Sequence, residues 1–497
     1  MKTIFKLLVT FICLLAQISF TYFIYLTLEQ KYPIIRIIYS FFCLWVILKI
    51  IKDSRSYSFS LPWIIIFMLL PIPGSIIYLT IRLDKKLNGF IRRIAKEEKF
   101  NKQYLIQDKN IKEKYKDNSS MNYISDFCKF PITTNNKVKY YPLGDDVFET
   151  MINELKKAKE FIFLEYFIID SGKFWDSILE VLKEKAKEGV EVRVMYDDLG
   201  CIGTLPVGYP RKLKKMGIKC RPFNSLRPFA GVVLNNRDHR KILVIDGKVA
   251  FSGGINLADE YINLNSKYGH WKDNAIKVEG DAVWNYTVMF LTMWNAVKKE
   301  DSSYIRYKRL STITKENGFM APYGDNPLDG ENVGENVYLN IINNSNKYVY
   351  IFTPYLIIDS DIVDALILAA KRGVDVRIVI PGIPDKKMVY TISKSYIEPL
   401  SKGGVKVYFY TPGFVHSKVF ISDDIRATVG TFNMDYRSLY LHFECGCYFE
   451  NVDVIKDIKK DLLNTIDKSK LVSLKEYKVG PLKSFWQSVL RLFAPFM

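Results

Sequence analysis

The chain has only four histidines, and its acidic residues are outnumbered: 53 Asp and Glu stand against 71 Lys and Arg, a formal net charge of +18 over 497 residues. Its seven cysteines show no spacing typical of a disulfide framework. Cys445 and Cys447 are too close in sequence for a typical zinc pair, and no second pair occurs elsewhere. We therefore expect no disulfide-stabilised fold and no metal.

Two of the four histidines occupy the same place in a duplicated motif, His-x-Lys-x4-Asp. The two copies consist of His239, Lys241 and Asp246, and of His416, Lys418 and Asp423. Each copy continues into a glycine-containing segment that ends in asparagine, at Asn256 and at Asn433. The mostly apolar residues between Lys and Asp suit a buried strand with His and Lys on one face at its start. Two imidazoles and two ammonium groups brought together predict a phosphate site.

The duplication extends upstream of the motifs. Residues 166–170 match 355–359, and residues 186–194 match 370–378. Each half therefore reads as strand, helix, glycine, strand and motif strand; the first helix is expected to end at Gly189 in a left-handed cap. Strands that alternate with helices indicate an α/β fold with largely parallel sheets covered by helices.

The N-terminal region, residues 1–81, is apolar enough to predict a helical membrane anchor of two or three spans. Segments 7–28 and 56–81 carry no charge, and 37–48 is apolar between Arg36 and Lys49. A cleaved signal peptide is the alternative for the first segment, but no small-residue cleavage pattern follows it. The break at residues 71–74 makes the third segment a candidate for a re-entrant or interfacial piece.

A basic run follows the last apolar segment and opens a polar linker, residues 82–132. The positive-inside rule places this run, and the catalytic domains after it, in the cytoplasm. The net charge also allows a nucleic-acid partner or a solvated lysine-rich surface. Because membrane segments are present, we favour a face held against anionic lipid, at about 1 kcal/mol per basic residue near the surface. No nucleic acid is expected.

The duplicated motif resembles the signature of the phospholipase D superfamily, with both copies complete. The surrounding sequence resembles bacterial cardiolipin synthases of the phospholipase D type over nearly the whole chain. The segments that carry this likeness are 235–241, 252–261, 269–273 and 430–438. One departure is His442, where the resemblance implies Asn before Phe443 and Glu444; the carboxylate is retained.

The resemblance implies two phospholipase D-like α/β sandwich domains, residues 133–318 and 319–497, related by pseudo-twofold symmetry with the motifs at their interface. It also implies His239 as nucleophile and His416 as acid/base, an order that the near symmetry leaves open. Asp273 and Glu444 are the expected orienting carboxylates. Asp246 and Asp423 are interpreted as architectural members of the motif.

The chemistry expected of such a site needs no metal or cofactor. A neutral imidazole attacks phosphorus while a protonated one donates to the departing oxygen. Lys241, Lys418, Asn256 and Asn433 would hold the non-bridging oxygens, work that other phosphoryl-transfer enzymes give to a divalent ion. For His270 and His442, a satisfied core residue is the default interpretation.

The residues predict the phosphatidyl-transfer chemistry, and the resemblance alone implies the lipid: a multi-pass cell-membrane cardiolipin synthase that converts two phosphatidylglycerols into cardiolipin and glycerol. Its partners would be phosphatidylglycerol and anionic membrane lipid, with the oligomeric state left open. A phospholipase D, or a phosphatidyltransferase with another acceptor, is the alternative enzyme. A lipid-binding scaffold with a dead site is the alternative class, but intact His, Lys and Asn in both copies argue against it.

The C-terminal apolar face at residues 485–493 is expected to dock on the core, with an interfacial membrane helix as the alternative.

Overall fold

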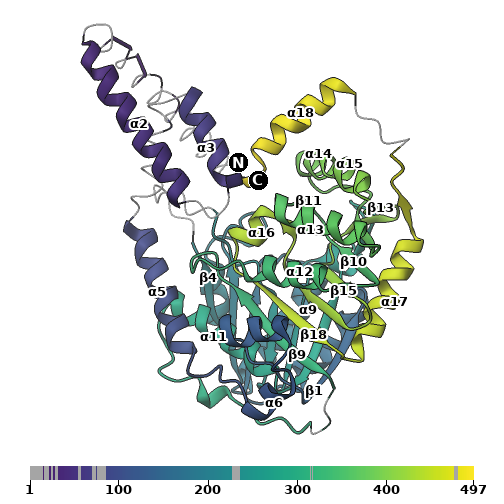
Figure 1. The fold of residues 1–497 in the computed structure, drawn as a ribbon. Helices are drawn as coiled ribbons and strands as arrows, with labels where there is room; N and C mark the ends of the chain where they lie inside the picture. Colours follow the sequence, from purple (N-terminus) through teal and green to yellow (C-terminus); the bar gives the residue numbers. More distant parts are fainter. Residues whose placement is uncertain are drawn as a thin grey trace. The chain divides into compact units, whose positions relative to one another are not determined.

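The computed structural model describes residues 15, 19, 22–23, 26–27, 32–53, 57–69, 74, 85–225, 235–313, 315, 317–474 and 480–496. The chain divides into two compact units (Figure 1). The smaller unit combines residues 1–88 with 492–496, and the larger one, which we call the body, spans 89–491.

The smaller unit contains helices α2 (Pro33–Asp53) and α3 (Tyr57–Leu69). They pack through Val46, Ile50 and Phe67. Among the described residues, no helix combines the length and apolar character needed to cross a membrane. Most of the predicted span 7–28 and much of 56–81 lie outside the described residues, so the predicted anchor is not confirmed.

The body is built on two mixed sheets. The first has the order β1-β8-β6-β5-β2-β3-β4 and the second the order β19-β13-β12-β10-β15-β16-β18-β9. The first sheet comprises β1 (Asn136–Tyr141), β2 (Phe161–Tyr166), β3 (Glu191–Asp197), β4 (Lys219–Phe223), β5 (Ile242–Ile245), β6 (Val249–Gly253) and β8 (Ala275–Gly280). The second comprises β9 (Phe319–Asp325), β10 (Tyr348–Phe352), β12 (Asp375–Pro381), β13 (Lys406–Tyr410), β15 (Val419–Ser422), β16 (Arg426–Gly430), β18 (Glu444–Glu450) and β19 (Ser469–Leu471). Read from opposite ends, the two orders correspond strand for strand, with β19 as an addition.

The prediction of an α/β fold is confirmed, but that of largely parallel sheets is wrong. Among the described strands of these two sheets, only β2-β3-β4 and β10-β12-β13 run parallel. The motif strands β5 and β15 pair antiparallel with both neighbours. The cause lies after each motif aspartate: the chain turns back at once into β6 or β16 instead of crossing over through a helix, and a tight return forces antiparallel pairing.

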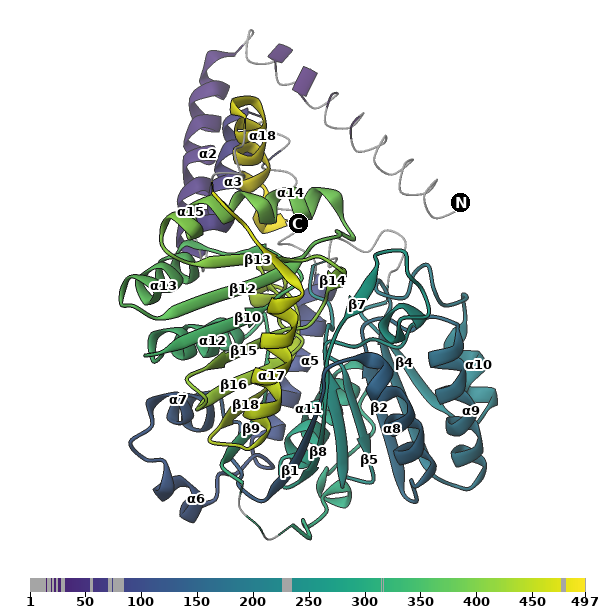
Figure 2. The same cartoon turned by 90° about the vertical axis from the view of Figure 1, so that its right-hand side faces the viewer.

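Helices cover the outer faces of the sheets and also lie between them (Figure 2). Those of the first half are α8 (Gly144–Lys156), α9 (Lys173–Lys187), α10 (Tyr209–Lys215) and α11 (Val283–Val297). Those of the second are α12 (Val333–Asn343), α13 (Ser360–Lys371), α14 (Lys387–Ser395), α15 (Ile397–Lys402), α16 (Tyr436–Tyr440) and α17 (Val454–Asp467). Helix α9 ends next to Gly189, whose φ of 91° confirms the predicted left-handed cap.

The two halves contact each other through α11 and α17. Helix α11, almost entirely buried, packs on its own strands β2 and β5 and on β9 of the second half. Helix α17 packs on β10, β13 and β15 and on β1 of the first half. Apolar residues of both halves therefore share one core cluster, which positions the two motif strands relative to each other.

The segment 89–132, predicted as part of a polar linker, belongs to the body. It contains α5 (Lys85–Asn101), α6 (Lys109–Lys114), α7 (Ser119–Asn122) and a π-helical turn at Tyr123–Phe127. Its apolar residues Ile94, Leu105, Tyr115 and Met121 are buried. The four-part division of the chain remains a prediction.

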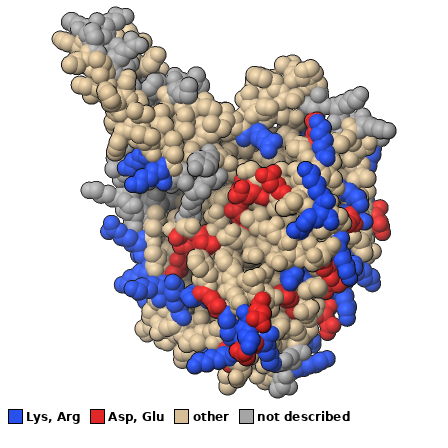
Figure 3. All heavy atoms as spheres, in the orientation of Figure 1, with Lys and Arg blue, Asp and Glu red and all other residues tan. Residues whose placement is uncertain are grey.

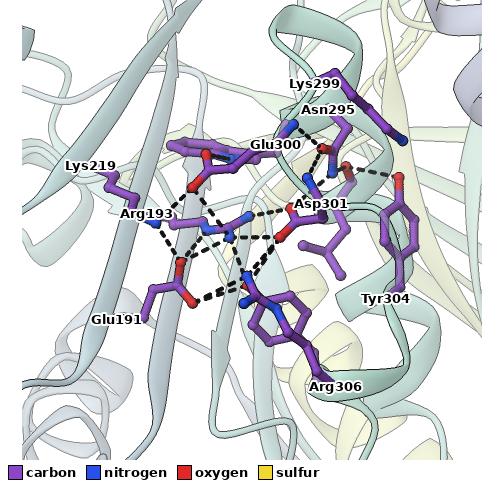
Figure 4. A network of polar contacts seen from close by, with 12 residues as sticks. Glu191, Arg193, Lys219, Asn295, Lys299, Glu300, Asp301, Tyr304 and Arg306 are labelled. Carbon is purple, nitrogen blue, oxygen red and sulfur yellow. Dashed lines mark hydrogen bonds and ion pairs between the residues drawn. The ribbon is translucent and has the colours of Figure 1, made fainter.

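A buried ion-pair network fixes the segment after α11 to strand β3 (Figure 4). The guanidinium of Arg193, fully buried, lies 2.6 Å from Asp301 and 2.9 Å from Glu191. Lys219 on β4 adds contacts of 2.8 Å to Glu191 and 2.6 Å to Glu300. In the second half, the matching Arg377 is one-quarter exposed and pairs with Asp375.

The body surface mixes both charges. On the face that Figure 3 shows, acidic and basic side chains are interspersed over the body. Helix α18 (Pro481–Leu492) exposes Leu482, Phe485 and Trp486. Val489 and Leu490 of the same face are partly buried, so the expectation that this face docks on the core stays a prediction. Gln487 is buried, and its amide donates to the Thr391 carbonyl at 3.4 Å.

Candidate active site

The two His-x-Lys segments lie where the halves of the body meet. Each directly precedes its motif strand and is not part of it, because β5 begins at Ile242 and β15 at Val419. Each segment is bonded to the opposite half: the His239 amide donates to the Phe443 carbonyl at 2.9 Å, and the His416 amide to the Lys272 carbonyl at 2.7 Å. The site therefore contains backbone from both halves.

Two short strands position the contact between His416 and Lys272. Strand β7 (His270–Lys272) of the first half pairs in parallel with β14 (Gly413–Val415) of the second. This pair ends where His416 follows β14 and Asp273 follows β7. Ahead of the other histidine, Asp238 forms an isolated bridge with Phe443.

Each imidazole is oriented by a carboxylate from the other half. His239 Nδ1 lies 2.9 Å from both carboxylate oxygens of Glu444, and His416 Nδ1 lies 2.6 Å from Asp273 Oδ2. An ionised carboxylate only accepts hydrogen bonds, so this contact places the imidazole proton on Nδ1. The Nε2 lone pair of each ring is then available for attack or for taking a proton. Both predicted orienting carboxylates thus contact the histidines.

Hydrogen bonds from neighbouring residues hold both carboxylates in place. Glu444 accepts a hydrogen bond from the Thr431 hydroxyl, and Asp273 accepts one from the Asn274 amide at 2.8 Å. Gly254 leaves room for Asp273, because a Cβ at that position would collide with its carboxylate. This close approach explains the second glycine of the Gly253-Gly254 pair.

Both motif lysines are buried and point back to their histidines. Lys241 Nζ donates to the His239 carbonyl at 2.6 Å, and Lys418 Nζ donates to the His416 carbonyl. Lys418 Nζ also lies 2.9 Å from His416 Nδ1. Since Asp273 is closer to that nitrogen and can only accept, we assign the Nδ1 proton to the Asp273 contact. An ammonium has three donors, so donors remain on each lysine for an incoming anion.

The two asparagines differ in their contacts. Asn256 accepts from the Ile168 amide at 3.0 Å and donates to the Tyr261 hydroxyl at 2.7 Å. Asn433 is buried, and within the described residues its Oδ1 has no hydrogen-bond partner. A side-chain amide has two N–H donors, so Asn256 retains one for a phosphate oxygen.

The motif aspartates lie at the far ends of the motif strands. Asp246 accepts hydrogen bonds from three consecutive backbone amides at residues 159–161, at 2.8, 2.8 and 2.9 Å. Asp423 does the same at residues 346–348, at 2.7, 2.9 and 2.9 Å. Each carboxylate thus ties the end of a motif strand to the start of β2 or β10, a contact that fits an architectural part.

Burial dominates the electrostatics of the site. It lowers the pKa of His239 to about 3 and that of His416 to about 4, against the opposing effect of their carboxylates. Burial also lowers the pKa of Lys241 to about 8 and of Lys418 to about 7. For Glu444, burial favours a higher pKa, but the charge and hydrogen bond of His239 bring the pKa below its ordinary value. Without a bound anion, both imidazoles are neutral at pH 7.

Sequence reasoning missed several neighbours of the histidines. Thr431, inside the second motif segment, holds Glu444. The rings of Tyr261 and Trp271 lie 5.4 Å from that of His416, and the ring of Phe414 lies 6.0 Å away. The position of Trp271 two residues before Asp273 was a usable signal. His270, taken as a satisfied residue, contacts the Tyr410 hydroxyl at 3.0 Å.

His442 does not fit the default of a satisfied core residue. It is 9% exposed, and within the described residues neither ring nitrogen has a hydrogen-bond partner. With His239 and Glu444 it forms the one group in the described part of the chain whose ligand atoms are placed to hold a metal ion.

Duplicated sheets that bring two complete His-x-Lys sets together define a phospholipase D-like fold and site. A family model described as "Cardiolipin synthase, PLD-like domain" matches residues 151–294 and 338–466, and the chain belongs to this family.

The chain is similar to relatives along most of its length. An uncharacterized protein of Streptococcus mutans is 45% identical over 434 residues, 86% of this chain and 94% of that protein. A cardiolipin synthase of Clostridium perfringens is 33% identical and covers 90% of this chain and 95% of its own. The crystal structure of a phosphatidylserine synthase from Haemophilus influenzae has a TM-score of 0.59 at 13% identity, over 76% of this chain and 100% of that one. That last likeness shows the fold alone.

Proposed function

We propose that this protein is a cardiolipin synthase that transfers a phosphatidyl group from one phosphatidylglycerol to the hydroxyl of another and releases glycerol. The observation that carries the proposal is the reciprocal pairing of His239 with Glu444 and of His416 with Asp273 across the two halves. The relatives named cardiolipin synthase supply the lipid and the acceptor.

In the first half-reaction, His239 Nε2 attacks phosphorus and the P–O bond to the glycerol headgroup breaks. His416, protonated on Nε2, gives that proton to the departing glycerol oxygen. The positive charge that develops on the His239 ring lies against Glu444, 2.9 Å from its Nδ1. The ammonium groups of Lys241 and Lys418 neutralise the non-bridging oxygens.

In the second half-reaction, His416 is neutral and takes the proton of the acceptor hydroxyl. The acceptor oxygen attacks phosphorus, the bond to His239 Nε2 breaks, and both imidazoles return to their starting states. A bound phosphodiester supports the protonated state of His416 that the first half-reaction requires, because its negative charge offsets the repulsion from Lys418.

The same proposal places the body at a membrane surface, with residues 1–81 as the anchor and the catalytic domains, 133–318 and 319–497, on the cytoplasmic side. Large apolar side chains exposed on α2, such as Ile38 and Phe41, support a lipid environment for that helix. The exposed Phe485 and Trp486 of α18 support an interfacial contact.

The test is a lipid extract of cells that express the chain in a background that lacks cardiolipin. Cardiolipin should appear with the intact chain and be absent with His239→Ala or His416→Ala, which serve as matched controls. Phosphatidic acid in place of cardiolipin would identify water as the acceptor and support a phospholipase D. Another phospholipid in its place would identify a different alcohol.

A further inference from the structure

His442 is the one buried histidine near the site that the proposed reaction does not use. It lies between α16 and β18, with its ring centroid 5.6 Å from that of His239. Its Nδ1 is 3.7 Å from Glu444 Oε1, too far for a hydrogen bond. A buried polar group without a partner costs free energy, and an ion that enters the site would offset that cost.

The positions of the neighbouring donors suit a metal ion. Glu444 Oε1 lies 2.9 Å from His239 Nδ1 and 3.7 Å from His442 Nδ1, and all three ligand atoms of the group lie within 4.8 Å of one another. Bonds of about 2.0–2.1 Å in a tetrahedral zinc site place ligand atoms roughly 3.3 Å apart. Two imidazoles and one carboxylate are a ligand set that holds zinc with the fourth position open to water.

We infer that His239, His442 and Glu444 bind Zn²⁺ and that this binding inhibits the protein. Imidazole ligands favour zinc over magnesium, which prefers oxygen. The inhibitory effect rests on the proposed function of His239, whereas the binding does not.

The inhibition follows from the tautomer of His239. In the metal-free site its proton lies on Nδ1, toward Glu444, and the Nε2 lone pair is free. A zinc ion that binds Nδ1 takes the place of the proton there, and the neutral ring then carries its one proton on Nε2. The nitrogen that attacks phosphorus is then blocked by a proton. Glu444, now a zinc ligand, no longer accepts from the ring.

The binding test uses the purified full chain, stripped of metal and titrated with Zn²⁺ against a chromophoric chelator. The wild type should bind one zinc ion per chain at this site, and His442→Asn should bind it at least about tenfold more weakly, since asparagine is a poor zinc ligand. His270→Asn is the matched control and should bind as the wild type does. Equal affinity in His442→Asn, or a loss confined to His270→Asn, overturns the inference.

A measurement on the wild type keeps the inference testable if His442→Asn does not fold. X-ray absorption at the zinc edge should show scattering from two imidazoles; one or none overturns the site. Zn²⁺ should lower the rate of phosphatidyl transfer from labelled phosphatidylglycerol in the wild type, and less so in His442→Asn, while Mg²⁺ should not. If zinc binds through two imidazoles and transfer continues unchanged, the inhibitory effect is refuted. If no transfer occurs even without zinc, the proposed function fails and the binding result stands.

Discussion

Replacing Glu444 by glutamine is the sharpest perturbation of the proposed mechanism. The substitution preserves the size of the side chain but removes the negative charge that contacts His239 Nδ1. It also introduces an amide group that can donate to Nδ1, which would shift the ring proton to Nε2. Both effects act on the attacking histidine and leave the two lysines in place.

The magnitude follows from the geometry. The ring of His239 becomes positive as the phosphohistidine forms, with its charge about 4 Å from the centre of the carboxylate. Two unit charges at that distance interact by about 4 kcal/mol at an effective dielectric constant of about 20. A barrier raised by that amount slows the step by about 10³-fold. The matched substitution Asp273→Asn removes the equivalent charge from His416.

The assay measures phosphatidyl transfer and, separately, the labelled phosphatidyl group trapped on the protein. Glu444→Gln should lower the rate by about 10³-fold and trap no label, because attack itself is slowed. Asp273→Asn should affect both proton transfers by His416, so any intermediate that forms should persist longer. A Glu444→Gln protein within tenfold of the wild-type rate would refute the electrostatic argument. Label that persists in Glu444→Gln but is absent from Asp273→Asn would reverse the roles of the two histidines.

Four further outcomes are expected. Arg193→Ala should lower the free energy of unfolding by about 3–5 kcal/mol, because it removes the buried charge that pairs with both Asp301 and Glu191, whereas Arg377→Ala should cost less than about 1 kcal/mol; equal denaturant midpoints would contradict this. The value of kcat/KM should fall as pH rises above about 4, where free His416 loses the proton that it must donate, fall more steeply above 7 to 8, where Lys418 and then Lys241 lose theirs, and fall at low pH as His239 gains one; a flat profile from pH 5 to 9 would count against this site. Activity should survive EDTA, and a loss that Mg²⁺ restores would disprove phosphate binding by lysine and asparagine alone. A chain that begins at Gly89 and is given micellar phosphatidylglycerol should shift product from cardiolipin toward phosphatidic acid; an unchanged ratio at equal turnover would show that the body alone selects the acceptor.

The parts of the site that depend on residues close together in sequence could be predicted from the sequence. A spacing of two residues placed each lysine with its histidine, and the duplication indicated that two such sets belong together. The left-handed cap at Gly189 was visible for the same reason: it depends on neighbours in sequence. Local rules of this kind require no knowledge of the partner half.

The pairing of histidines with carboxylates could not be predicted from spacing. Glu444 follows the second motif and Asp273 the first, yet each contacts the histidine of the other half. The exchange depends on how the halves pack, through α11 and α17, and this is a long-range property. Antiparallel pairing of β5 and β15 was missed for a related reason: the alternation of strands and helices suggested crossovers, while the turn after each motif aspartate reverses the chain.

Helix α18 shows a limit of amphipathic patterns. Its apolar face predicted contact with the core, and in the structure this face is partly buried at Val489 and Leu490 and exposed at Phe485 and Trp486. A hydrophobic face specifies that a helix needs an apolar neighbour; it does not specify whether that neighbour is protein or lipid.

Each half of the body depends on the other for the orientation of its histidine, because the carboxylates are exchanged between the halves. A single half contains a histidine, a lysine and an asparagine, but the acceptor that fixes its imidazole tautomer belongs to the other half. The backbone amide of each histidine is also bonded to the residue just before that carboxylate, Phe443 or Lys272. Correct packing of the halves therefore orients the imidazole and places its carboxylate in the same step. The same contacts therefore join the halves and orient the histidines, and each half takes from the other the carboxylate that fixes its imidazole tautomer.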